Sequence, residues 1–115
     1  MQQVLLVAFQ GEAMCFVHVL LNALDMAQRG LTAKIIIEGM AVKLPGELNQ
    51  PDHPFHALYV KTKEAGLIEG VCKACSAKMG ALAAVQAQGL PLLEDMMGHP
   101  SLGRYLQEGY TIITF

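Results

Sequence analysis

Short, almost wholly apolar runs alternate along this chain with longer segments of helical spacing. The first two runs are VLLVAF at residues 4–9 and AKIIIEG at residues 33–39. Runs without polar alternation are typical of parallel strands that are buried on both faces, because such strands have no solvated side. Helices between such strands serve as the crossover connections. The alternation therefore predicts an α/β fold, a three-layer α/β/α sandwich with a mostly parallel sheet of about five strands.

Helical spacing, glycine and proline mark the other elements. We expect helices over residues 12–29, 55–66, 74–79, 81–88 and 100–108, and further strands over residues 67–72, 90–93 and 110–115. The segment KLPGELNQPDHP, residues 43–54, contains three prolines and is expected to form a loop. No internal repeat or linker divides the sequence, so we expect residues 1–115 to form a single domain.

Composition excludes several classes of protein. Hydrophobic residues make up 53% of the chain and charged residues 16%, and the net charge is −2. Without a basic block, nucleic-acid binding is not expected. No apolar run reaches the roughly 18 residues that a membrane span requires, and the opening MQQVLLVAFQ lacks the basic region of a signal peptide. The apolar composition instead predicts a homo-oligomer, in which part of the surface is covered.

The cysteines carry the clearest chemical pattern. Three cysteines in a chain long enough to fold without disulfides indicate a reducing, cytoplasmic environment. Cys72 and Cys75 form a C-x-x-C pair, with Cys72 at the end of an expected strand and Cys75 in the first turn of an expected helix. Free amide groups and the positive end of the helix favour thiolate there, and Lys73 and Lys78 would add to this if they turn inward. We interpret the pair as a candidate reactive site at the carboxyl edge of the sheet, where ligands bind in such folds.

The remaining candidate residues have weaker patterns. Cys15 lies in the first turn of the first expected helix, from which it can approach the C-x-x-C pair. His18 lies on a polar stripe of that helix, and His53 and His56 lie in or just after the proline-rich loop, where surface positions are expected. His99 precedes a proline in the stretch GHPS, and the sequence assigns no chemical role to it. For a zinc site, His53, His56 or His99 would supply the nitrogen ligand.

Several motifs together resemble those of the DsrE/DsrF-like family of small sulfur-handling proteins. The motifs are VLLVAFQGEA, KIIIEGMAVKL, AGLIEGVCKACSAKMG, GLPLLEDMMGHPS and GYTIITF, and they span nearly the whole chain. The resemblance is closest to the stand-alone cytoplasmic branch and implies a Rossmann-like sandwich in a hexameric or smaller assembly. It also implies that Cys72, eight residues before Gly80, holds the position of the cysteine that takes up sulfane sulfur as a persulfide. The C-x-x-C pair is a departure, since the sulfur-relay subunits do not generally have one.

Three functions remain open on the sequence. In the first, Cys72 takes up sulfane sulfur from a donor protein and passes it to an acceptor, as a carrier or sulfurtransferase-like enzyme, or Cys75 resolves the persulfide as in a reductase. In the second, Cys72, Cys75, Cys15 and one histidine bind zinc, although only the C-x-x-C half has suitable spacing. In the third, the cysteines are inert and the chain is a binding or assembly module. No cofactor is expected, because the sequence has no G-x-G-x-x-G or P-loop motif.

Overall fold

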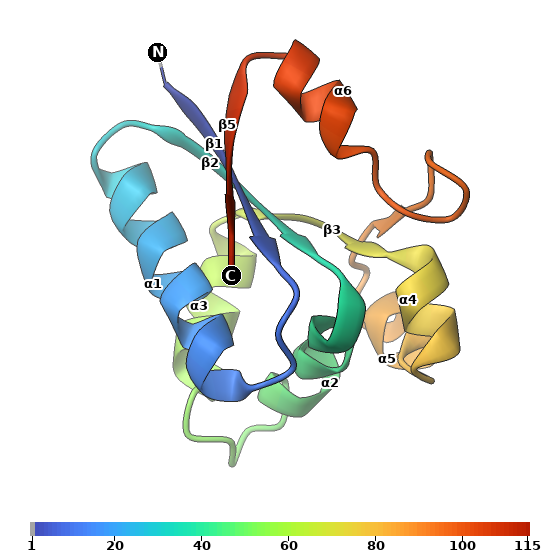
Figure 1. Ribbon diagram of the computed structural model, residues 1–115. Helices are drawn as coiled ribbons and strands as arrows, with labels where there is room; N and C mark the ends of the chain where they lie inside the picture. Colours follow the sequence, from blue (N-terminus) through green and yellow to red (C-terminus); the bar gives the residue numbers. More distant parts are fainter. Residues whose placement is uncertain (1) are drawn as a thin grey trace.

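The computed structural model describes residues 2–115 and contains a five-stranded sheet (Figure 1). The strands are β1 (Gln3–Ala8), β2 (Thr32–Ile37), β3 (Ile68–Cys72), β4 (Leu92–Leu93) and β5 (Tyr110–Thr114). All neighbouring strands pair in parallel, in the order β4-β3-β2-β1-β5. The predicted parallel sheet of about five strands is therefore confirmed.

The helices follow the strands in the expected order, with one correction. They are α1 (Ala13–Gln28), the 3-10 helix η1 (Gly39–Lys43), α2 (Leu44–Leu48), α3 (His56–Glu64), α4 (Lys73–Lys78), α5 (Leu82–Ala87) and α6 (Leu102–Gln107). The loop predicted over residues 43–54 is wrong in its first half, which forms α2. Pro45 is compatible with this helix because it stands in the first turn, where its missing N–H is not needed.

The direction of the crossovers explains why helices cover both faces of the sheet. Strands β1 to β4 are added in one direction, so right-handed crossovers place α1, α3 and α5 on one face. The connection from β4 to β5 runs back across the sheet, and its helix α6 therefore packs on the other face (Figure 1). This arrangement is the predicted three-layer α/β/α sandwich of Rossmann-like type.

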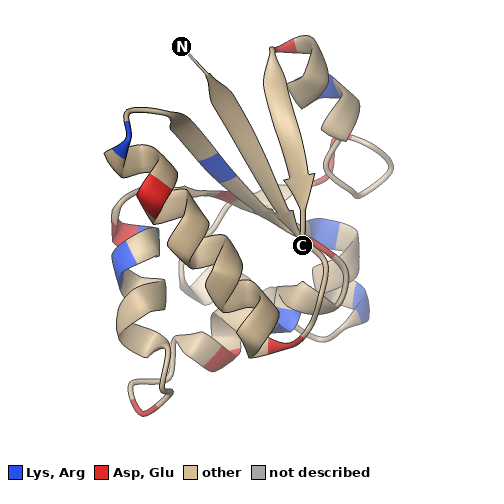
Figure 2. Ribbon diagram, turned by 60° about the vertical axis from the view of Figure 1, so that its left-hand side comes forward, with Lys and Arg blue, Asp and Glu red and all other residues tan. Residues whose placement is uncertain are grey.

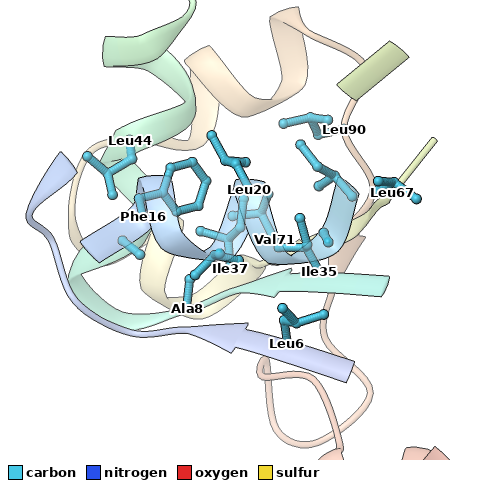
Figure 3. Close-up of a cluster of buried hydrophobic side chains, with 14 of the residues drawn as sticks. Leu6, Ala8, Phe16, Leu20, Ile35, Ile37, Leu44, Leu67, Val71 and Leu90 are labelled. Carbon is cyan, nitrogen blue, oxygen red and sulfur yellow. The ribbon is translucent and has the colours of Figure 1, made fainter. Parts of the chain in front are cut away.

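Two apolar clusters lie against the two faces of the sheet. The larger cluster joins the sheet to α1, α2, α3 and α5, and Figure 3 shows Leu6, Phe16, Leu20, Ile35 and Leu44 among its members. The smaller cluster, under α6, contains Leu5, Val7, Ile36, Tyr105 and Tyr110. Successive strand residues point to opposite faces, so a strand in the middle of this sheet must be apolar throughout. The apolar residues 4–8 of β1 and 35–37 of β2, all buried, meet that need.

The outer side of α1 is apolar in part. Figure 2 shows that charged residues are few along α1, and Met14 and Leu21 on this helix are 66% and 49% exposed. A groove of about 520 Å³ runs between α1 and α3, lined mainly by apolar side chains with Asp25 and Lys61 beside them. Within residues 2–115, no helix is both long and apolar enough to cross a membrane.

Candidate functional site

Cys72 and Cys75 lie where β3 gives way to α4 at the carboxyl edge of the sheet. Cys72 is the last residue of β3 and the N-cap of α4, and Cys75 is in the first turn of that helix. The N–H of Cys75 donates a hydrogen bond of 3.4 Å to the Sγ of Cys72. The side chain of Cys72 is buried, whereas that of Cys75 is partly exposed. The strand-to-helix position predicted for the pair is confirmed.

His99 completes the cluster from a distant part of the chain. Its Nδ1 lies 3.2 Å from the Sγ of Cys72 and 3.9 Å from the Sγ of Cys75. A tight turn brings it there, in which Met96 and His99 exchange two backbone hydrogen bonds of 2.7 Å and 2.9 Å. Met97 and Gly98 at the centre of this turn have φ values of 52° and 91°, as in a type I′ turn. The contact makes His99 a candidate functional residue, although the sequence assigned no chemical role to it.

The turn is held against α4 by a shared carbonyl group. The N–H of Ala74 donates to the carbonyl oxygen of Gly98 at 2.8 Å, and the Cys72 thiol lies 3.7 Å from the same oxygen. A Cβ atom at Gly98 would lie 3.1 Å from the Cβ of Ala74, in addition to the cost of a positive φ. Glycine at this position therefore keeps His99 and the start of α4 in contact.

Glu38 is a candidate functional residue that the sequence analysis missed. It directly follows β2 at the same edge and is only 7% exposed. Burial raises the pKa of Glu38, and the neighbouring imidazole of His99 partly offsets that rise. The charge of Glu38 also helps to raise the pKa of Cys72. The sequence does contain a signal for Glu38, because this carboxylate directly follows the three isoleucines at residues 35–37. It therefore stands at the carboxyl edge of the sheet, where ligands bind in such folds.

The expected lowering of the Cys72 pKa is wrong for this free thiol. Burial raises the pKa of Cys72 to about 11, and the hydrogen bond from the amide of Cys75 does not offset that effect. Lys73 does not turn inward, because its Nζ lies 3.3 Å from the carboxylate of Glu94 on the surface. Ionising Cys72 near neutral pH therefore needs a proton acceptor. The imidazole of His99 is a candidate, because its Nδ1 lies 3.2 Å from the Sγ of Cys72.

A small hollow lies beside Cys75. It has a volume of about 260 Å³ and is lined by Gly39, Met40, Cys75, Lys78 and Met79. Cys75 forms part of its wall whereas Cys72 does not, so a molecule in the hollow meets Cys75 first. Lys78 is the charged residue of this wall, and it forms no ion pair or hydrogen bond with any residue in the described range 2–115.

Cys15 does not join the C-x-x-C pair. It lines a separate depression of about 290 Å³ with His18, Asn22 and Phe115. Across residues 2–115, the group of side chains close enough to share a metal ion is Cys72, Cys75 and His99.

His53 and His56 have local roles instead. The Nδ1 of His53 accepts a hydrogen bond of 3.0 Å from the N–H of Phe55, just before α3. The Nδ1 of His56 lies 2.9 Å from the carbonyl oxygen of Leu48 and ties α3 to α2. Of the three histidines considered as zinc ligands from the sequence, the structure brings His99 alone to the cysteines.

Comparisons with known proteins identify a relative and a similar structure. The uncharacterized protein MJ0733 of Methanocaldococcus jannaschii is 35% identical over 96 residues, which are 84% of this chain and 76% of that protein. The structure of BT1422, a conserved protein of unknown function from Bacteroides thetaiotaomicron, matches with a TM-score of 0.72 and 22% identity, over 99% of this chain and 95% of the other. This match agrees with the α/β fold. No protein-family model matches the chain.

Proposed function

We propose that this chain handles sulfane sulfur through Cys72 and Cys75. The chain belongs to the same family as the uncharacterized protein MJ0733. The observation that carries the proposal is the distance of 3.2 Å between the Sγ of Cys72 and the Nδ1 of His99. A thiol within hydrogen-bond reach of a base is the arrangement by which cysteine nucleophiles are activated. A second thiol at C-x-x-C spacing supplies a partner for exchange.

The first step takes place at Cys75, because this residue lines the hollow. Its thiolate attacks the outer sulfur of an organic persulfide, R–S–SH. The bond between the two sulfur atoms of the donor breaks, and the thiol R–SH leaves. Cys75 then carries the transferred sulfur as a persulfide. The sequence favoured Cys72 for this step, but its burial separates it from an approaching donor.

The second step uses Cys72, whose Sγ lies within 4.8 Å of the Sγ of Cys75. His99 accepts the proton of Cys72, and the thiolate attacks the Sγ of Cys75. The outer sulfur leaves as hydrogen sulfide, and a disulfide joins the two cysteines. In sum, R–S–SH and two thiols give R–SH, H₂S and one disulfide, with two electrons passing from the cysteines to the sulfane sulfur. A small thiol or a dithiol protein is the co-reactant that reduces the disulfide again.

The remaining sequence expectations are part of the same proposal. We place the chain with the DsrE/DsrF-like proteins on the resemblance of its motifs, and we assign it a sulfurtransferase-like or reductase-like activity. A cytoplasmic location suits a chain whose three cysteines are free thiols. A homo-oligomer would cover the exposed Met14 and Leu21 on α1 and the groove between α1 and α3.

A persulfide donor should change the mass of the protein in a way that identifies each cysteine. Reduced, metal-free wild-type protein is expected to lose two hydrogen atoms and to release one sulfide per chain. The variant Cys72→Ser is expected to gain one sulfur atom, because the persulfide on Cys75 then has no thiol to attack it. Serine is chosen since it can cap α4 as Cys72 does. Intact mass spectrometry measures each product.

The matched control for this experiment is Cys15→Ser, which should behave like the wild type because Cys15 lies in the separate depression. The variant Cys75→Ser should keep its mass. If Cys75→Ser gained sulfur in a Cys15→Ser background, the first step would belong to Cys72. If no form changed its mass, sulfane-sulfur handling would be excluded.

The charge of Lys78 should make the hollow selective for anionic donors. The test uses a Cys15→Ser background and measures how fast Cys75 reacts with an anionic and with a cationic alkyl thiosulfonate. We expect Lys78→Gln to lower the ratio of the anionic rate to the cationic rate about three- to fivefold, as expected for one charge at close range. Thiol loss over time measures both rates. Lys73→Gln is the control, since Lys73 pairs with Glu94 on the surface. Equal slowing of both reagents would show that Lys78 does not select charge.

A further inference from the structure

We infer that the reduced site also binds one zinc ion, through the Sγ atoms of Cys72 and Cys75 and the Nδ1 of His99. This inference goes beyond the proposed function, because metal binding requires no sulfur donor. It concerns the same side chains, so bound zinc would compete with sulfur chemistry.

The distances between the three atoms suit a tetrahedral zinc ion. Ordinary Zn–S and Zn–N bond lengths at tetrahedral angles place sulfur and nitrogen about 3.6 Å apart, and two sulfurs about 3.8 Å apart. The Nδ1 of His99 lies 3.2 Å from the Sγ of Cys72 and 3.9 Å from that of Cys75. All three atoms lie within 4.8 Å of one another. The two sulfur–nitrogen distances thus differ from the tetrahedral value by only a few tenths of an ångström.

The donor set also has the chemistry that zinc prefers. Two cysteine thiolates and one imidazole occur as the protein ligands of open zinc sites, in which an exogenous molecule takes the fourth position. Binding replaces the two thiol protons by the metal, so each zinc ion that binds releases two protons. Cys75 borders the hollow, and the open position would therefore be reached from there.

Two features around the ligands support a built site. Glu38, which directly follows β2 at the same edge of the sheet, is only 7% exposed. A carboxylate close to a histidine ligand is a common means of orienting that ligand. On the other side, the type I′ turn and the bond from Ala74 to Gly98 fix His99 against α4. The ligands are thus held in place by two separate parts of the chain, the junction of β3 with α4 and the turn that carries His99.

Zinc bound in this way would regulate the thiols. Both sulfur atoms would be held as metal thiolates, and neither would be free to form the disulfide that ends sulfur transfer. We therefore expect zinc-loaded protein to release sulfide from a persulfide donor at least tenfold more slowly than metal-free protein. A chelator should restore the rate.

Cobalt(II) provides the spectroscopic test, without any sulfur donor. Reduced protein titrated with Co²⁺ under nitrogen is expected to show thiolate charge-transfer bands and the visible bands of tetrahedral cobalt, which saturate at one ion per chain. Added Zn²⁺ should remove them. The variants Cys72→Ser, Cys75→Ser and His99→Ala should each bind at least tenfold more weakly, whereas Cys15→Ser and His56→Ala should bind as the wild type does.

The outcomes separate this inference from the proposed function. Circular dichroism of each variant in chelator shows whether it is folded before metal is added. Absence of the cobalt bands in folded wild-type protein would overturn the zinc site and leave the sulfur assay, which is run in chelator, unaffected. Wild-type affinity in folded His99→Ala would overturn the three-ligand site. Binding with no sulfur uptake would support the zinc site alone.

Discussion

The variant His99→Ala is expected to release sulfide about 100- to 10,000-fold more slowly than the wild type at pH 7, the usual contribution of a positioned general base. The reason is the pKa of Cys72, which burial raises to about 11. At pH 7 only about one Cys72 in ten thousand would be ionised without a proton acceptor. Cys75 should still take up sulfur, since the first step occurs in the hollow. Single-turnover sulfide release, with intact mass measured in the same samples, separates the two steps.

The pH dependence of this variant provides a further check. Raising the pH removes the proton from Cys72 directly, so the sulfide-release rate of His99→Ala should rise about tenfold per pH unit until the pH approaches about 11. The wild type should respond much less steeply. His56→Ala is the matched control, because the ring of His56 bonds to Leu48 away from the site. A wild-type rate in His99→Ala at pH 7 would contradict the role of His99 as the base.

The variant Tyr105→Ala is expected to lower the free energy of unfolding by about 3–5 kcal/mol, as for other buried aromatic residues. Tyr105 is fully buried and anchors α6 in the smaller apolar cluster. Its ring meets Tyr110 edge to face, with 5.6 Å between centroids, and its hydroxyl donates to Glu69 at 2.7 Å. Helix α6 has only six residues, so it depends on this packing for its stability. Urea unfolding followed by circular dichroism measures the loss.

Tyr105→Phe is the matched control for the ring. It keeps the packing and removes the hydroxyl, so it should cost about 1 kcal/mol. If the alanine variant were no less stable than the phenylalanine variant, α6 would not belong to the cooperative fold. The comparison also bears on function, because the segment that carries His99 lies between β4 and α6.

The fold was accessible from the sequence because its signals are local. The apolar runs of β1 and β2 needed burial on both faces, and the segments between the strands had helical spacing and glycine ends. Cys72 was placed correctly because it stands where such a run meets a helix. Helix α2 was missed because the prolines of residues 43–54 suggested a loop, although Pro45 occupies a position in the first turn where proline is tolerated.

The site was accessible only in part because its central contact is not local. Cys72 and His99 are 27 residues apart, and they meet through a turn in which Met97 adopts a positive φ of 52°. Methionine seldom adopts this conformation, so the sequence gives little indication of the turn. The pKa of Cys72 also depends on its burial, which the C-x-x-C pattern does not reveal. The helix end favoured the thiolate, but complete burial outweighed it.

The most direct test of the proposed function is to identify the bond that forms in wild-type protein after a single turnover with a persulfide. Lys73 lies between the two cysteines, so trypsin separates them into EAGLIEGVCK, residues 64–73, and ACSAK, residues 74–78. We expect these two peptides to appear as one disulfide-linked species that a reductant separates, together with one sulfide released per chain. Peptides that remain unlinked after the donor has been consumed would contradict a function based on the Cys72–Cys75 pair.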